Sequence, residues 1–564
     1  MKKLIECVPN ISEGRDINII NQVTSEIEKV DGVKLLDVDP GATTNRTVIT
    51  FVGEPEPVCE AAYRVVKKAA ELIDMSQHHG AHPRQGATDV CPLIPVSNIS
   101  MDEVVEYAHR LAHRLGNELQ IPIYCYENAA RIPERRNLAY CRTGEYESLS
   151  SRLGSDQWKP DFGPNCWNDH VARTGATQVG ARDFLVAINY NLNSTSTRRA
   201  NAIAFDVREK GRPKREGGKP SGKTIKNENG ETVMIPGTLK GTKAIGWYIE
   251  DYGIAQVSMN ITSIKQTPVH VAFDEVCRCA ANRGIRITGC EIVGLIPKSV
   301  LIDAGKHYLA RQQRSLGVSE DEIMKVAIKS MGLDDLKPFN PKEKVIEFLI
   351  EDDSKKLVDL TCVGFCEETA SESPAPGGGS VSAMMGAMGA SLGTMVANLT
   401  GGKAAYDDEW EKFSVVAEKG QAIKDELLRL VDEDTNAFNM IMNAFGLPKK
   451  TDEEKMARSA AIQEATRFAT EVPFRTMQKS FEAFEICRAM VEWGNPASVT
   501  DGGVGALAAR SAVIGAHLNV KINASSLKDE SFKKEILDKA AAIEAAAIKE
   551  EAEILAIVNQ KIGL

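Results

Sequence analysis

Three histidines lie close together in one loop near the beginning of the chain. His78, His79 and His82 fall within the segment 76–88, which also carries glycines and Pro83. The unperturbed pKa of histidine lies nearest to neutral pH, so this loop is suited to proton transfer. Because His82 precedes a proline, its backbone is restricted to extended conformations, which favours His82 as an acid–base catalyst. A metal site and a plain polar surface loop are the alternatives.

A carboxylate lies inside an apolar stripe in the last third of the chain. If residues 423–445 form a helix, Asp434 falls in the middle of the stripe. Burying an unpaired ionised carboxylate is costly, so Asp434 must be paired, protonated or used in catalysis. We interpret it as a site residue whose pKa is shifted towards neutral pH, and a core ion pair is the alternative. The apolar members of the stripe are Ile423, Leu427, Leu430, Val431, Phe438, Ile441, Met442 and Phe445.

Two glycine-rich segments are candidate ligand sites. In the segment 161–182, glycines on both sides of Trp167 let the backbone approach a ligand, and Trp167 offers a stacking face. The segment 374–380, PAPGGGS, leads into an uncharged stretch that is predicted to be a helix. Free N–H groups at a helix start form an anion site, so a carboxylate ligand could dock there. A flexible entry loop is the alternative for this second segment.

A third glycine motif matches a phosphate-binding loop by spacing alone. Gly217, followed by Gly222, Lys223 and Thr224, satisfies the pattern GxxxxGKT. That motif requires a strand before it and a helix after it, whereas a charged run precedes it here and a polar turn follows it. We therefore interpret residues 208–226 as an exposed basic excursion that attracts an anionic ligand at most.

The predicted elements divide the chain into three regions and a linker. Strand and helix patterns follow the order βαββαβ twice, which predicts two α/β subdomains of split-βαβ type, at 1–182 and 183–350. A polar linker, 351–357, separates them from an all-α helical bundle, 358–564. The uncharged stretch 373–402 is long enough to span a membrane. Because it is rich in Gly, Ala, Ser and Met, we expect a buried helix instead, and no membrane contact.

Composition excludes several classes of protein. The net charge of −10 over 564 residues argues against a nucleic-acid partner, because phosphate contacts need clustered Lys and Arg. The beginning of the chain shows no signal-peptide pattern, and the 12 cysteines form no C-x-x-C pair, so we expect reduced thiols and a cytoplasmic location. No histidine lies near the pairs Cys277/Cys279 and Cys362/Cys366, so no metal is expected.

The motifs together resemble one enzyme family. The segments 6–14 (ECVPNISEG), 36–39 (LDVD), 44–47 (TNRT), 78–84, 89–92 and 161–164 are similar to glutamate formiminotransferase. The segments 374–380, 431–438 and 494–496 are similar to formiminotetrahydrofolate cyclodeaminase. Their order is that of the fused family, formiminotransferase-cyclodeaminase, and the resemblance covers essentially the whole chain.

The resemblance implies a function in two steps. The first domain would transfer the formimino group from N-formimino-L-glutamate to tetrahydrofolate, in polyglutamylated form as co-substrate, and the second would form 5,10-methenyltetrahydrofolate and release ammonia. No tightly bound cofactor and no metal would be needed, and the assembly would be a homo-oligomer, a ring of dimers. A cyclohydrolase second domain, a formyl donor and a non-enzymatic folate-binding scaffold are the alternatives. The implied catalytic residues are His82 and Asp434. The implied substrate- and folate-binding residues are Asp39, Arg46, Gly378 and Ser380, together with a folate-binding loop that comprises Gly163, Pro164, Asn165, Cys166, Trp167, Asn168, Asp169, His170 and Val171.

Overall fold

The computed structural model describes residues 3–42, 45–79, 84–219, 221–350 and 356–563. By its internal contacts the chain forms two compact units. Unit 1 comprises residues 1–300 and 331–351, and unit 2 comprises residues 301–330 and 352–564. The segment 301–330, which the sequence placed in the second α/β subdomain, thus packs with the helical unit. One reason is that Gly317 approaches Ala417 closely and its carbonyl accepts hydrogen bonds from Asn398 and Gln421.

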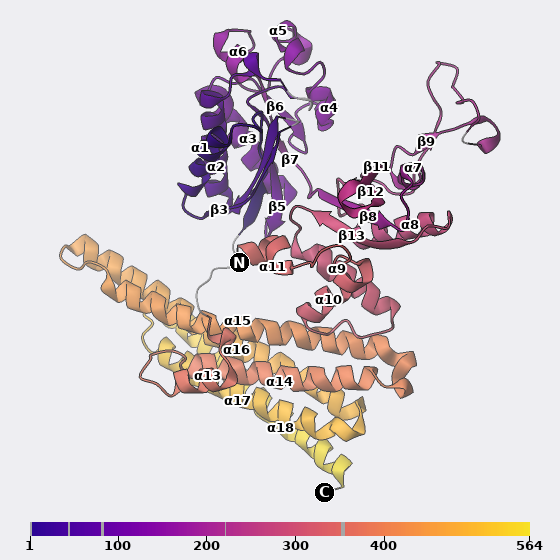
Figure 1. Ribbon diagram of the computed structural model, residues 1–564. Coiled ribbons are helices and arrows are strands. Elements are labelled where there is room, and N and C mark those ends of the chain that lie inside the picture. The colour runs from indigo at the N-terminus through magenta and orange to yellow at the C-terminus, as the bar shows by residue number, and fades with distance from the viewer. Residues whose placement is uncertain (1–2, 43–44, 80–83, 220, 351–355, 564) are drawn as a thin grey trace. The chain divides into compact units, whose positions relative to one another are not determined.

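The first α/β subdomain is built on a seven-stranded sheet (Figure 1). The strand order is β1-β4-β2-β5-β7-β6, and β3 pairs with β4 at the edge. Strands β5, β7 and β6 run parallel, whereas β1 to β4 pair in antiparallel fashion. The strands are β1 Leu4–Cys7, β2 Asn10–Ile11, β3 Val33–Gly41, β4 Arg46–Gly53, β5 Thr88–Ser97, β6 Ile123–Glu127 and β7 Thr177–Ala181.

Three helices cover one face of this sheet. They are α1 Ile17–Glu28, α2 Pro55–Leu72 and α3 Met101–Glu118, whose buried apolar stripes share one core with the strands. Ser100 and Glu103 form a capping box that fixes the start of α3. The other face of the sheet receives the short helix α4 Leu138–Cys141 and the loops that follow it. This face carries the polar groups of the first candidate site.

The second subdomain has a four-stranded antiparallel sheet of order β11-β12-β8-β13. Its strands are β8 Val186–Leu192, β11 Thr242–Ile249, β12 Ile254–Ile261 and β13 Ile287–Val293, and its helices are α7 Thr197–Val207 and α8 Val269–Ala281. The basic excursion extends from this sheet as the pair β9 Arg212–Pro213 and β10 Met234–Ile235. In its described residues no helix follows Lys223 and Thr224, so the phosphate-loop motif lacks its required context.

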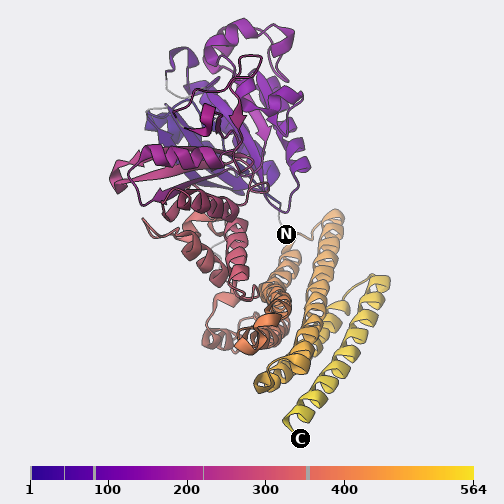
Figure 2. The same cartoon turned by 90° about the vertical axis from the view of Figure 1, so that its right-hand side faces the viewer.

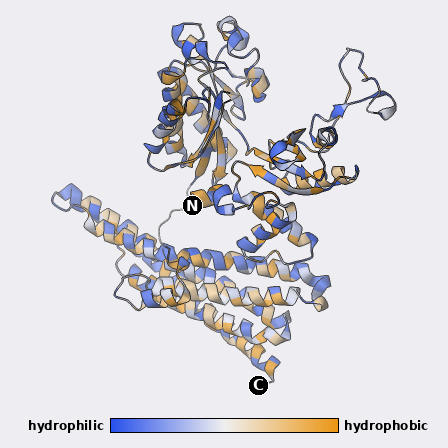
Figure 3. Cartoon of the chain, in the orientation of Figure 1, coloured by the Kyte–Doolittle hydropathy of each residue, from blue (hydrophilic) through white to orange (hydrophobic). Residues whose placement is uncertain are grey.

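Unit 2 is helical, and its long helices lie side by side (Figure 2). α14 is long and apolar enough to cross a membrane, but 61% of its most apolar window is buried among α15, α16 and α17. Hydrophilic residues gather at the tip where α15 joins α16 (Figure 3). The helices are α9 Lys298–Arg311, α10 Glu320–Met331, α13 Cys362–Thr369, α14 Gly378–Gly401, α15 Trp410–Gly446, α16 Asp452–Trp493, α17 Val499–Ala524 and α18 Glu530–Ile562.

Candidate functional site

A large polar cleft opens on unit 1, lined by both basic and acidic side chains. Its volume is about 1440 Å³, and both subdomains contribute to its walls. Acidic groups such as Glu127, Glu145 and Glu147 also lie along it, so its charges are largely arranged in pairs. The cationic residues that line it are Arg46, Arg84, Arg142, Arg182 and Lys243. A cleft of this composition suits a small substrate that carries carboxylates.

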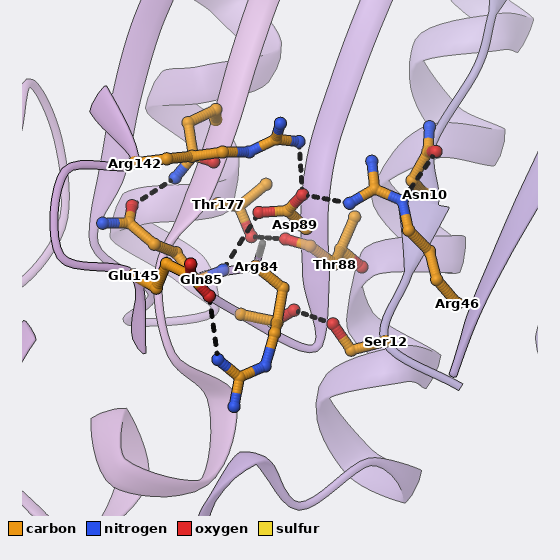
Figure 4. Close-up of polar contacts among 12 residues, drawn as sticks. Asn10, Ser12, Arg46, Arg84, Gln85, Thr88, Asp89, Arg142, Glu145 and Thr177 are labelled. Carbon is orange, nitrogen blue, oxygen red and sulfur yellow. Dashed lines mark hydrogen bonds and ion pairs between the residues drawn. The ribbon is translucent and has the colours of Figure 1, made fainter. Parts of the chain in front are cut away.

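Asp89 holds two of these arginines. Arg46 Nη1 lies 2.5 Å from Asp89 Oδ2, and Arg142 Nη2 donates to the same oxygen from the opposite side (Figure 4). Asp89 Oδ1 accepts the N–H of Gln85 at 3.0 Å, and Asn10 Oδ1 accepts Arg46 Nε–H at 3.1 Å. Asp89 is fully buried. Burial lowers the pKa of Arg46, and the Asp89 carboxylate opposes that shift.

A strand irregularity directs Asp89 towards these arginines. Asn10 and Ile11 of β2 pair with Val90 and Thr88 of β5, so the register shifts and Asp89 is the extra residue between them. Such a bulge re-aims the side chain of the extra residue. The sequence prediction named neither Asp89 nor Arg142 as a site residue, although Asp89 begins the quoted segment 89–92. The available signal for Asp89 was a charged residue in an otherwise apolar strand, whereas Arg142 follows the short helix α4 without a pattern of its own.

The described ends of the histidine loop are fixed by Arg84. Its Nε–H donates to His78 Nδ1 at 3.3 Å, and its Nη2 lies 2.7 Å from Glu147 Oε1. His78 Nε2 lies 2.9 Å from the carbonyl oxygen of Asn45. With Nδ1 accepting, Nε2 must carry the proton, so the ring is neutral. Burial lowers the pKa of His78 accordingly.

These contacts leave His78 without a free nitrogen for proton transfer. His79 lines the cleft, and the Nδ2–H of Asn45 donates to its carbonyl oxygen at 3.1 Å. His82 falls in the segment 80–83, which lies outside the described residues. Its catalytic role therefore stays a prediction.

The predicted folate-binding loop lies beside the turn that holds Arg84. The Trp167 side chain is 39% exposed, and its ring centroid lies 6.0 Å from that of Tyr146. The N–H of Tyr146 donates to the Arg84 carbonyl oxygen at 2.9 Å. Gly163 has a φ of 82°, and a Cβ there would lie 2.1 Å from the Ile121 carbonyl oxygen, so only glycine fits.

Several members of this loop have structural contacts. The Oδ1 of Asn168 caps α6 Asp169–Thr174, the Oδ1 of Asn165 accepts the N–H of Gly154, and His170 Nε2 lies 2.8 Å from the Leu119 carbonyl oxygen. Val171 is buried, whereas Cys166 and Asp169 are exposed, and Pro164 is half-buried. Among the described residues, the cleft lining includes Arg46 but no member of 163–171. Asp39 is exposed on β3 and does not line the cleft either.

The second candidate site joins α14 to α15. Asp434 Oδ2 accepts the N–H of Ser380 at 2.9 Å and its hydroxyl at 3.1 Å. Ser380 lies in the first turn of α14, so the carboxylate sits at the positive end of that helix. Burial raises the pKa of Asp434, and the hydrogen bonds from Ser380 only partly oppose this. No described residue forms an ion pair with Asp434, so the alternative interpretation as a core ion-pair partner is not seen among the described residues.

The glycines of the segment 374–380 leave room for the Asp434 carboxylate because they have no Cβ. A Cβ on Gly379 would lie 2.1 Å from Asp434 Oδ1. Gly378 is exposed and its backbone can face a ligand, whereas the side chain of Ser380 is fully buried against Asp434 and the Val431 carbonyl oxygen. Ser380 thus positions Asp434.

The apolar stripe around Asp434 is confirmed on one side only. Ile423, Leu427, Leu430 and Val431 are buried, but the predicted members beyond Asp434 are not fully covered. α14 begins opposite Asp434 and ends near Phe413, so α15 extends past its partner. Three of the predicted members are therefore exposed: Phe438, Met442 and Phe445.

Three family models match successive segments of the chain, and the second of them includes the segment 301–330 that packs with unit 2. The family model described as "Formiminotransferase domain, N-terminal subdomain" matches residues 4–182, and "Formiminotransferase domain" matches residues 187–351. The model described as "Formiminotransferase-cyclodeaminase" matches residues 361–542. Each half of the chain thus matches its own family models.

Individual relatives match the whole chain or one half of it. The formimidoyltransferase-cyclodeaminase of Gallus gallus is 40% identical over 564 residues, which cover 100% of both chains. A glutamate formimidoyltransferase of Thermoplasma acidophilum is 40% identical over 54% of this chain and 92% of its own. A methenyltetrahydrofolate cyclohydrolase of Methylorubrum extorquens is 42% identical over 31% of this chain and 83% of its own. Because a relative that is 40% identical matches the chain from end to end, the chain belongs to the formimidoyltransferase-cyclodeaminase family.

Proposed function

We propose that this protein transfers the formimino group of N-formimino-L-glutamate to tetrahydrofolate and then cyclises the product to 5,10-methenyltetrahydrofolate with release of ammonia. The observation that carries the proposal is the end-to-end match to relatives whose names join these two activities. The polar cleft of unit 1 and the half-buried Asp434 of unit 2 offer one site for each step.

The first step requires one proton to change places. N5 of tetrahydrofolate attacks the amidinium carbon, an N5–C bond forms, and the bond from carbon to the glutamate nitrogen breaks. The proton lost by N5 must reach the departing nitrogen, which leaves as the amine of glutamate. A histidine with a near-neutral pKa can accept the first proton and donate the second. We assign this role to His82, because both ring nitrogens of His78 are already occupied.

The second step needs an acid and a base at one carbon. N10 attacks the formimino carbon and loses its proton, and the amino group on that carbon must be protonated to leave as ammonia. Asp434 suits this exchange because burial raises its pKa, so that its protonated form persists to a higher pH than for an exposed aspartate. The Ser380 contacts fix the carboxylate without supplying a counter-charge.

A second candidate function for unit 2 rests on one comparison. The relative from Methylorubrum extorquens that matches 31% of this chain is named a methenyltetrahydrofolate cyclohydrolase. In that case the helical unit would act on the methenyl product with water and release no ammonia. A formyl donor for the first site is the corresponding alternative in unit 1. The nitrogen balance of the reaction distinguishes both from the main proposal.

We further infer the assembly, location and subdomain type. A homo-oligomer built as a ring of dimers is supported by exposed apolar residues on α14 and α17, among them Met388, Leu399, Val504 and Leu518. A cytoplasmic location is supported by 12 free cysteine thiols. The succession of strands and helices in each α/β subdomain supports the split-βαβ type.

Two single substitutions test the assignment of one step to each site. We expect His82→Ala to abolish formimino transfer while supplied 5-formiminotetrahydrofolate is still cyclised. We expect Asp434→Asn to stop ammonia release while transfer continues, so that 5-formiminotetrahydrofolate accumulates. His113→Ala on α3 and Asp425→Asn on α15 are the matched controls and should retain both steps. Near-normal transfer by His82→Ala, or near-normal cyclisation by Asp434→Asn, would contradict the proposal.

A further inference from the structure

The pair Arg46 and Arg142 has one shared anion, and that anion is buried. Asp89 is fully buried, whereas the side chains of Arg46 and Arg142 are 11% and 15% exposed and both line the cleft. The carboxylate therefore lies behind the two guanidinium groups, in the floor of the cleft. Its charge of −1 faces two charges of +1, so the three groups together remain cationic.

The geometry of this cluster limits how the guanidinium groups can move. Arg46 is held at Nη1 by Asp89 and at Nε by Asn10 Oδ1. Arg142 is held by Asp89 through Nη2, while its Nε is buried and has no hydrogen-bond partner among the described residues. Because that donor is buried, a ligand in the cleft would instead meet the exposed part of the Arg142 side chain, which lines the cleft. The planar fork of arginine is suited to carboxylate acceptors.

We propose that Arg46 and Arg142 bind the carboxylates of the formimino donor, and that Asp89 is the positioning residue that keeps both guanidinium groups facing the cleft. This inference rests on the proposed function, in which the donor is a dicarboxylate. It extends that function because neither Asp89 nor Arg142 was predicted as a site residue, although Asp89 begins the segment 89–92 that resembles the family. The folate co-substrate would be bound elsewhere, so the two substrates should respond differently to changes at this cluster.

Steady-state kinetics of three variants tests the proposal. Arg46→Lys and Arg142→Lys keep the charge but lose the fork, and Asp89→Asn keeps an acceptor for the Gln85 N–H but loses the charge. In each variant we expect the KM for formiminoglutamate to rise about tenfold or more, with kcat and the KM for tetrahydrofolate changed less than about twofold. Glutarate, which has two carboxylates and no amine, should inhibit competitively against the donor and lose potency to the same extent.

The controls separate binding from folding. Arg114→Lys removes a comparable arginine that pairs with Glu60 between α2 and α3, outside the cleft lining, and should leave every kinetic constant unchanged. Unfolding temperatures are measured for all variants. If Asp89→Asn does not fold, the two lysine variants still decide the matter.

Two results would overturn the inference. One is an unchanged KM for formiminoglutamate in both folded lysine variants. The other is an equal rise in the KM of both substrates together with a lower unfolding temperature, which indicates a purely structural cluster. Failure of the proposed function is distinct from either, because the unmodified protein would then not turn over formiminoglutamate at all.

Discussion

Replacing Gly379 by alanine perturbs the second site without removing any of its functional groups. Gly379 lies in the first turn of α14, directly under the carboxylate of Asp434. An added Cβ would lie 2.1 Å from Oδ1 and 2.5 Å from Cγ of Asp434. The carboxylate has to retreat by about 1.3 Å, the difference between 2.1 Å and an ordinary contact of 3.4 Å. The hydrogen bonds from Ser380 must then lengthen or break.

The size of the effect follows from that displacement. A misplacement of about 1 Å at a catalytic group typically lowers the rate about a hundredfold, so we expect cyclisation to fall by about that factor. The effect on stability is smaller. Overpacking costs about 1–3 kcal/mol, and the better helix propensity of alanine returns about 1 kcal/mol. The expected net loss in the free energy of unfolding is therefore about 0–2 kcal/mol.

The assay follows ammonia release from supplied 5-formiminotetrahydrofolate, together with formimino transfer and thermal unfolding. Gly446→Ala at the end of α15 is the control, because a Cβ added there would have no atom within 4 Å and Gly446 belongs to neither candidate site. We expect transfer to be normal in both variants and cyclisation to be lost only in Gly379→Ala. Cyclisation at the normal rate in a folded Gly379→Ala variant would refute the placement of Asp434 as the reacting carboxylate.

Three further predictions concern unit 1. Burial raises the pKa of Glu6 to about 7, so the folded state keeps this carboxyl protonated above its unfolded pKa, and the resulting stability is lost as pH rises from about 4.5 through 7. Thermal unfolding between pH 5 and 9 should show that the unfolding temperature of Glu6→Gln rises relative to that of the unmodified protein with increasing pH. Parallel curves for the two proteins would contradict this. Arg84→Ala should lower formimino transfer at least about tenfold and spare cyclisation, because Arg84 fixes His78, which lies four residues before the proposed catalyst His82 in the sequence. Unchanged transfer kinetics would argue against that role. Calorimetry should detect no ATP binding to the unmodified protein or to the Lys223→Ala variant, because no helix follows this lysine in the described residues. Saturable ATP binding to the unmodified protein that is lost in the variant would restore the phosphate-loop interpretation.

Features that depend only on the spacing of apolar residues along a single helix were predictable from the sequence. Asp434 interrupts a stripe of i, i+3 and i+4 apolar residues, and the structure places it between α15 and the start of α14. The sequence could not show where α14 would begin against α15. The exposure of Phe438, Met442 and Phe445 follows from that pairing, and it was therefore missed.

The charged cluster of the cleft was beyond sequence reasoning. Arg46, Asp89 and Arg142 come from β4, β5 and the end of α4, and they meet only because a register shift turns Asp89 towards the two arginines. Neither the shift nor the path of the chain after β6 has a local signature. The helices at 301–330 illustrate the same limit, because their amphipathic pattern does not specify the unit against which they pack.

The most direct test of the two-step function is the stoichiometry of a single coupled reaction. Formiminoglutamate and tetrahydrofolate are supplied to the unmodified full-length protein, and glutamate, ammonia and 5,10-methenyltetrahydrofolate are measured over time. We predict that the three products appear in equal amounts, with 5-formiminotetrahydrofolate as the only transient species. Glutamate release without ammonia, or ammonia release without methenyltetrahydrofolate, would contradict the account.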